Sequence, residues 1–205
     1  MKVIFTTILS ILCWINAGAF KVYIFADMEG CSLLTNREQL NGSEGRLRMA
    51  QDINALFAHS FSSATIQMMY LNGRPVGEIG VDASIAGEHR VPVVMVSGDD
   101  KTMKEAKDWI PGVVTCQVKK GTSHLSGKCL AHKQSLDLIT KKTVQALKKR
   151  NSIKPLKATY PATIRWEYLP NGHPRVYDPK FTPVANPRSE EKSSANSIEK
   201  LLVGG

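Results

Sequence analysis

The chain has 205 residues, of which 42% are hydrophobic and 22% are charged. This balance is that of an ordinary folded protein, and it argues against collagen, wholesale disorder and a multi-pass membrane protein. Lys and Arg number 27 against 18 Asp and Glu, which gives a net charge of +9. A basic chain favours anionic partners, although net charge says nothing about the fold.

The first nineteen residues have the three parts of a secretory signal peptide. Lys2 gives a basic start, 3–15 is a mostly apolar run, and Ala17-Gly18-Ala19 matches a cleavage site. The run is too short to span a bilayer comfortably. We therefore expect a mature chain that begins at Phe20 and is secreted or periplasmic. A buried first strand or an uncleaved anchor would fit the same residues.

Strands and helices are predicted to alternate along the mature chain, because apolar runs and helical stripes follow each other. The Asn72-Gly73 pair favours a tight hairpin turn, and Pro75 suggests that the second arm lies at a sheet edge. The expected elements are a strand at 20–26, a helix at 46–57, a hairpin with arms at 66–71 and 74–79, a strand at 91–96, a helix at 101–109, a strand at 113–118 and a helix at 130–150.

The continuous apolar run at 91–96 is typical of a parallel strand that is covered on both faces. Together with the alternation of elements, it predicts a layered α/β fold with a mostly parallel sheet flanked by helices. In the helix at 130–150, we expect Leu136, Ile139, Thr143 and Leu147 to face inward.

The pattern weakens after Pro155. Residues 162–168 alternate like a strand, and 179–197, which is polar and rich in proline, is expected to be a loop or a disordered tail. The chain is therefore divided into a signal peptide at 1–19, a metal-binding α/β domain at 20–155, and a C-terminal segment at 156–205, which is partly disordered.

Two acids, Asp27 and Glu29, follow the first predicted strand in the sequence Asp-Met-Glu-Gly. Residues two apart in an extended chain point to the same side, and two carboxylates on one side repel unless a cation or a proton intervenes. Ligands collect beyond the carboxyl ends of strands in open α/β sheets. These acids are therefore candidate ligands of a divalent metal, although a solvated turn would also carry them.

Four further residues are candidates, of which Asp99 and Asp100 are secondary. Asp99 and Asp100 follow another strand, where they could help a cation site or cap the next helix. Glu78 lies in the second hairpin arm beside Gly77 and Gly80, whose small size allows other groups to approach closely. An exposed acid at a sheet edge, without a function, would fit the same residues. His59 follows the helix at 46–57, where a histidine can act as acid, base or ligand.

The cysteines give no metal-binding pair. Cys13 leaves with the signal peptide, and Cys31, Cys116 and Cys129 remain without a Cys-x-x-Cys spacing. One disulfide with a free thiol and three unpaired cysteines are both compatible with this number.

Three segments, in the same order along the chain, resemble the DppA-type D-aminopeptidases, the M55 family of zinc metallopeptidases. Residues 20–30 (FKVYIFADMEG) resemble the opening strand of the family and its D-M-E-G motif. Residues 58–80 (AHSFSSATIQMMYLNGRPVGEIG) resemble its histidine segment and hairpin, and 86–100 (AGEHRVPVVMVSGDD) the strand that follows.

The resemblance implies a site with two zinc ions that hydrolyses peptides from an N-terminal D-amino acid. In this scheme zinc would be bound by Asp27, Glu29 and Glu78, with Asp27 as the bridging ligand. His59 would transfer protons or act as the nucleophile. The family is also expected to form a ring-shaped homo-oligomer. Neither a nucleic-acid partner nor, after signal cleavage, a membrane is expected.

One departure from the family concerns the ligands. Family members carry several tens of residues between the first helix and the histidine segment, and these supply two histidine ligands. Here 55–58 connects the helix almost directly to His59, and neither histidine motif is present. Whether this shortened chain is active stays open.

Two other functions remain as alternatives. One is a Mg-dependent phosphatase of haloacid dehalogenase type, with Asp27 as nucleophile and Gly98-Asp99-Asp100 holding the metal. The other is a non-catalytic, basic secreted protein that is derived from the peptidase fold and binds anionic polymers.

Overall fold

The structure is a computed structural model, and it describes residues 61–203 apart from 124–125, 177 and 179. The signal peptide, the strand at 20–26 and the helix at 46–57 that we predicted lie outside the described residues. Within the described part, no helix is both long enough and apolar enough to span a membrane.

Eight strands and four helices make up the described part of the chain. In chain order they are β1 (Ile66–Leu71), β2 (Arg74–Pro75), α1 (Glu78–Glu88), β3 (Met95–Gly98), α2 (Asp100–Trp109), β4 (Val114–Gln117), β5 (Lys119–Ser123), β6 (Ser126–Cys129), α3 (His132–Lys149), β7 (Ala162–Tyr168), β8 (Arg188–Ser194) and α4 (Glu199–Val203).

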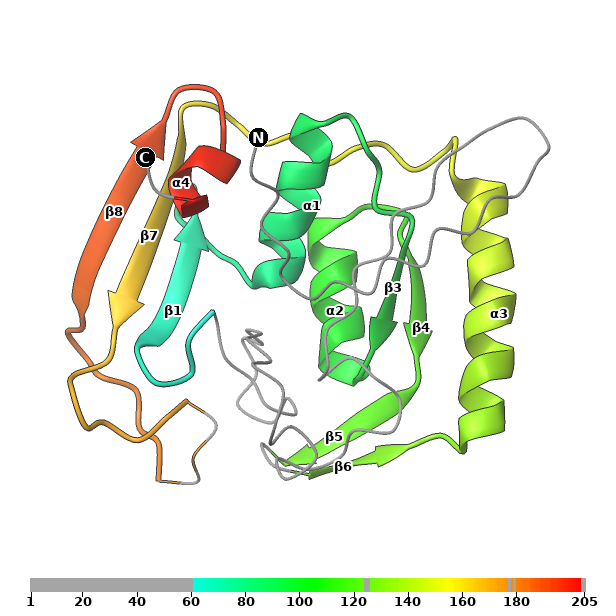
Figure 1. The fold of residues 1–205 in the computed structure, drawn as a ribbon, viewed down its shortest axis with the longest axis horizontal. Coiled ribbons are helices and arrows are strands. Elements are labelled where there is room, and N and C mark those ends of the chain that lie inside the picture. Colours follow the sequence, from blue (N-terminus) through cyan, green and yellow to red (C-terminus); the bar gives the residue numbers. More distant parts are fainter. Residues whose placement is uncertain (1–60, 124–125, 177, 179, 204–205) are drawn as a thin grey trace, which may run out of the picture.

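The largest sheet has four antiparallel strands in the order β2-β1-β7-β8 (Figure 1). Asn72 and Gly73 both adopt the positive φ values that the sequence predicts for the turn between β1 and β2. The side chain of Asn72 also accepts a hydrogen bond from the Thr163 amide at 2.8 Å and donates one to the Thr159 carbonyl at 3.0 Å. The hairpin turn therefore fixes β7 beside β1.

The prediction of a mostly parallel sheet is wrong. Only β3 and β4 pair in parallel among the described strands, with α2 as their crossover and α3 packed against both of them. A third sheet is the antiparallel pair β5-β6. The apolar run at 91–96 does indicate the parallel strand, but β7 returns about ninety residues after β1 and pairs with it antiparallel, and no local pattern encodes that pairing.

Glu78 does not lie in a hairpin arm, as we had predicted, but is the first residue of α1. The glycines of this helix hide it from a pattern analysis, because Gly lowers helix propensity. Close packing leaves no room for a side chain at either glycine. A Cβ on Gly80 would lie 2.8 Å from a ring carbon of Trp109, and one on Gly87 would lie 1.7 Å from the Leu156 carbonyl oxygen.

The expectation of a loop or disordered tail at 179–197 is wrong for 188–194, which form the edge strand β8, whereas 180–187 contain no helix or strand. This strand has no apolar residue of its own. Its cations instead lie over aromatic rings, with Arg188 4.1 Å from the ring centre of Tyr168 and Lys192 5.7 Å from that of Trp166. The predicted domain boundary at 155/156 stays a prediction.

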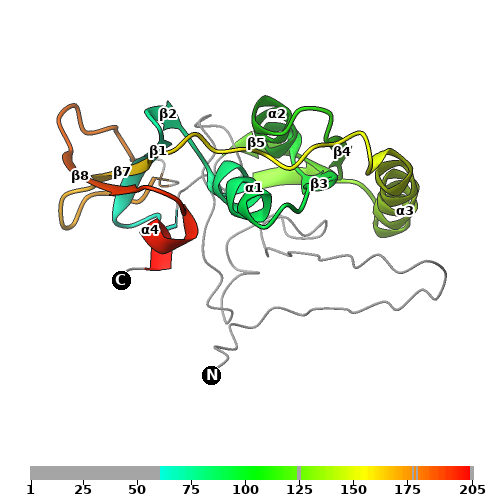
Figure 2. The same cartoon turned by 90° about the horizontal axis from the view of Figure 1, so that it is seen from above.

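The main core lies between the four-stranded sheet and the helices α1, α2 and α4, and it contains Met69, Ile79, Ile164 and Leu201. Figure 2 shows this sheet on one side of the molecule and α3 on the other, beyond β4. Helix α3 buries Ser135 and Ala146. Leu136, which we predicted to face inward, is 50% exposed.

Candidate functional site

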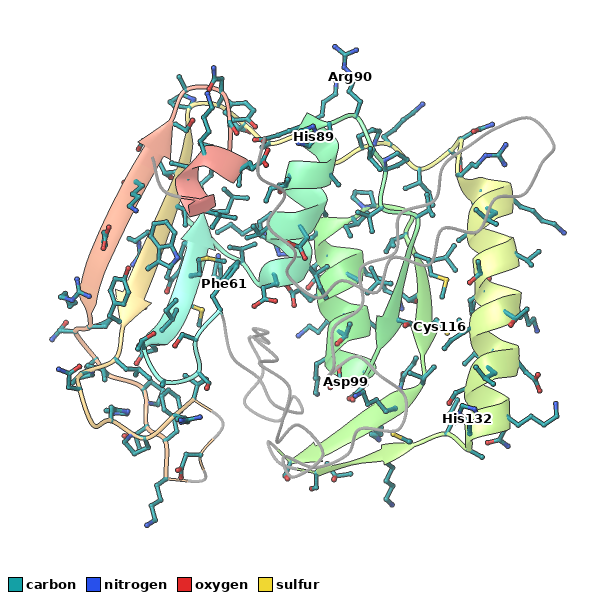
Figure 3. All side chains as sticks on the ribbon, viewed as in Figure 1. Phe61, His89, Arg90, Asp99, Cys116 and His132 are labelled. Atoms are coloured by element: carbon teal, nitrogen blue, oxygen red, sulfur yellow. The ribbon has the colours of Figure 1, made fainter. Side chains whose placement is uncertain are left out.

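Glu78 is the predicted metal ligand that the structure describes. Its residue is 9% exposed, and it occupies the first turn of α1, where a negative charge suits the helix dipole. The Phe61 amide donates a hydrogen bond to Oε1 of Glu78 at 3.1 Å. Figure 3 shows Phe61 beside the start of α1. The carboxylate is therefore held in one orientation by the segment that directly follows His59 in the sequence.

Two features around this carboxylate were missed by the sequence analysis. Phe61 has a φ of 43°, a left-handed conformation that costs a residue with a side chain about 1–2 kcal/mol and is found mostly at constrained sites. Glu105 of α2 accepts a hydrogen bond from the Gly77 amide at 3.0 Å, just before α1 begins. Neither residue type signals these roles, because both depend on contacts that are distant in the sequence.

Asp99 caps α2, which is one of the two roles that the sequence predicts for it. Its Oδ1 accepts hydrogen bonds from the amides of Lys101 at 3.1 Å and Thr102 at 2.8 Å, and the residue is buried. Asp100 is the first residue of α2. Its Oδ1 accepts a hydrogen bond from the Gly121 amide at 3.0 Å, which connects the helix to β5. Both acids therefore have structural partners.

The remaining candidates, Asp27, Glu29 and His59, lie outside the described residues. Among the residues that are described, no three His, Cys, Asp or Glu side chains come close enough together to hold a metal ion. The structure therefore shows where Glu78 lies, and the whole predicted ligand set, Glu78 included, stays a prediction.

Neither described cysteine has the character of a nucleophile. Cys116 and Cys129 are free thiols, and burial raises the pKa of both above the usual 9.0, against the smaller opposing effects of Lys142 and Lys119 respectively. A raised pKa keeps each thiol protonated at neutral pH, and the thiolate is the reactive form.

Comparison with known proteins gives a family match. Residues 48–177 match the model of the M55 peptidase family, which is described as D-aminopeptidase. A D-aminopeptidase of Bacillus subtilis (strain 168) is 45% identical over 91 residues, which are 44% of this chain and 33% of the relative. This alignment thus spans about a third of the length of the curated relative.

Among solved structures, the fold is similar to the Zn-dependent D-aminopeptidase DppA from Bacillus subtilis, which is described as a self-compartmentalizing protease. The TM-score is 0.64 at 27% identity, and the match covers 88% of this chain and 68% of the other. The family model covers more than half of the chain and includes Glu78, Asp99 and the segment around His59. The chain therefore belongs to the M55 family of D-aminopeptidases.

Proposed function

We propose that the chain is a zinc-dependent aminopeptidase that removes an N-terminal D-amino acid from peptides. The observation that supports this most directly is the bond between the Phe61 amide and the buried carboxylate of Glu78. It joins the two segments that resemble the histidine and glutamate motifs of the family, although they are 17 residues apart.

Zinc would be held by Asp27, Glu29 and Glu78. Carboxylate oxygens are ordinary zinc ligands, and carboxylates that bind metals are themselves usually held by hydrogen bonds. Glu78 meets this second condition, because the Phe61 amide fixes its Oε1. When bound, zinc supplies a Lewis acid that polarises the scissile carbonyl and lowers the pKa of water.

The protein groups perform the remaining steps. His59 is proposed to transfer protons between the attacking nucleophile and the leaving amine, or to attack the carbonyl itself. Glu78 would keep its orientation throughout, because it lies in the first turn of α1 and its carboxylate accepts the hydrogen bond from the Phe61 amide.

The two histidine ligands of the family have no counterpart in this sequence. Because zinc usually takes about four ligands per ion, and imidazole is a frequent one, we expect weaker zinc binding and slower hydrolysis than a complete site would give. The proposal extends to a secreted or periplasmic location and to a homo-oligomer. The description of the similar solved structure as self-compartmentalizing supports the oligomer.

The test is the release of D-alanine from D-alanyl-D-alanine by the purified full chain with added zinc. We expect release that a chelator abolishes, that the Glu78→Gln variant lacks, and that L-alanyl-L-alanine does not support. Glu191→Gln, an exposed acid on β8, is the matched control and should keep full activity. Hydrolysis that persists in chelator, equal activity of Glu78→Gln, or no hydrolysis at all would contradict the proposal.

A further inference from the structure

The positive charge of the chain is concentrated in one segment. Residues 132–157 contain eight Lys and Arg and a single acid, Asp137, so they carry +7 of the net +9. Most of the segment is α3, which is 18 residues and about 27 Å long. Figures 1 and 2 both show α3 at the outer end of the molecule, on the far side of β4 from α2.

The stability of the helix explains only part of this charge. Lys148 and Lys149 lie in the last turn of α3, where cations are favourable because the helix dipole is negative there. At the other end, Lys133 occupies the first turn, which contains no acid. Cations are unfavourable at that end. The first turn therefore carries charge that works against the helix.

An exposed stripe of uncharged side chains runs alongside the lysines. Leu136, Thr140 and Val144 follow each other at four-residue spacing and so share a face of α3. Leu136 is 50% exposed and Val144 is 48% exposed, which is more than the other exposed large hydrophobic residues of the described chain, such as Val91 at 39%.

The adjoining face of α3 is basic. Lys133, Lys141 and Lys148 are exposed on it together with Asp137. Lys133 pairs with Asp137 at 2.7 Å, whereas Lys141 and Lys148 form no ion pair with a described residue. The outer surface of α3 therefore presents apolar and cationic side chains next to each other.

We propose that this outer surface of α3 binds an anionic lipid bilayer peripherally. Clusters of four to eight Lys or Arg on an amphipathic helix are typical of attraction to acidic headgroups. Leu136 and Val144 distinguish a bilayer from a hydrophilic polyanion, because exposed apolar side chains gain free energy only where they can leave water. The surplus of lysines disfavours a second copy of α3 as the partner, since like charges would face each other.

This inference is independent of the peptidase site, and it changes one expectation from the sequence. The sequence led us to expect no membrane partner after signal cleavage. A basic helix that lies on the headgroups does not need to span the bilayer.

The experiment measures co-sedimentation of the full chain with vesicles of phosphatidylcholine mixed with phosphatidylglycerol, and with vesicles of phosphatidylcholine alone. We expect stronger binding to the anionic vesicles and a decrease as salt concentration rises. The double variant Lys141→Glu/Lys148→Glu should bind the anionic vesicles at least about thirtyfold more weakly, since each Lys near such a surface contributes about 1 kcal/mol.

Two further variants make the test specific. Lys104→Glu/Lys107→Glu changes the net charge equally on exposed positions of α2 and should bind nearly as well as the wild type. Leu136→Ser/Val144→Ser keeps the charge and should bind several-fold more weakly. All proteins carry the same residues 1–60, so that differences between them belong to the substituted helix, and thermal unfolding checks that each is folded.

Equal binding to neutral and anionic vesicles, equal losses in the α3 and α2 charge variants, or no vesicle binding would overturn the proposal. If binding requires only the lysines and Leu136→Ser/Val144→Ser binds like the wild type, the partner is a soluble polyanion or an acidic protein surface, and the lipid assignment is wrong.

Discussion

Among the glycines that the structure describes, Gly87 leaves the least room for a side chain. It lies near the end of α1, where the backbone of Leu156 approaches the helix, and a Cβ there would lie 1.7 Å from the Leu156 carbonyl oxygen. Backbone atoms cannot move aside as a flexible side chain can. Gly80, which is also in α1, faces the ring of Trp109 in α2. A small movement of this side chain could relieve part of the clash that a Cβ on Gly80 would cause.

We therefore expect Gly87→Ala to lower the free energy of unfolding by about 3 kcal/mol or more, because overpacking a tight contact forces the backbone to shift. Gly172→Ala is the control. It has open space around it and a φ of 77°, so only the strain of a left-handed alanine remains, about 1 kcal/mol. Urea unfolding of both variants measures the difference. A smaller loss in Gly87→Ala than in Gly172→Ala would show that Leu156 does not pack there.

Asp99 provides a second prediction at the scale of one residue. Because its carboxylate caps α2, Asp99→Ala should lower the free energy of unfolding by about 1 kcal/mol. It should leave zinc binding unchanged, whereas Asp27→Ala should abolish it. Thermal unfolding and elemental analysis of the two variants measure both effects. Equal, mild effects on zinc content in both variants would contradict the role that we propose for Asp27.

At the scale of elements, Glu88 fastens the C-terminal segment to α1. Its carboxylate accepts hydrogen bonds from the Ile198 amide, the Ser197 hydroxyl and the Tyr160 hydroxyl, and the adjacent His89 lies 3.3 Å from the carboxylate of Glu199. Burial alone would raise the pKa of Glu88, but the hydrogen bonds outweigh it and lower the pKa below 4.5. Burial, with the bond to Glu88, raises the pKa of Tyr160 to about 12.

These shifts predict how stability depends on pH. The stability from Glu88 is complete above pH 4.5 and is lost as the pH falls through the lowered pKa of the folded state. The stability from Tyr160 is complete below pH 10 and is lost as the pH rises towards 12. Glu88→Gln should be less stable than the wild type at neutral pH and should lose the acid-side dependence, as measured by urea unfolding across pH. Glu191→Gln should follow the wild type, and parallel curves for Glu88→Gln and the wild type would refute the interaction.

The elements that the sequence predicts well are those whose residues contain the signal themselves. The Asn72-Gly73 turn and the alternation at 162–168 are local patterns, and the structure has the turn and β7 at the predicted positions. α2 and α3 also lie close to their predicted ranges, although Leu136 of α3 does not face inward as predicted. β8 was missed because Arg188 and Lys192 stabilise it by lying over the rings of β7. Only the three-dimensional pairing shows what such polar residues cover.

At the scale of the whole molecule, the arrangement of sheets was beyond the sequence. The register that places Tyr70 opposite Arg165 is set by contacts between residues 95 positions apart, and no periodicity within either strand specifies the partner. The same is true of the geometry of the candidate site, which the sequence alone did not predict. The motif around Glu78 identified the residue, but its location at the start of a helix and its bond to Phe61 follow from the fold.

The central claim is that Glu78, held by the Phe61 amide, is a zinc ligand of an M55 peptidase site. Elemental analysis of the full chain, loaded with zinc and then dialysed, tests it most directly when the wild type is compared with Glu78→Gln and the Glu191→Gln control. We predict that the wild type and the control retain zinc and that Glu78→Gln retains much less. Equal zinc in all three proteins, or none in the wild type, would contradict the claim.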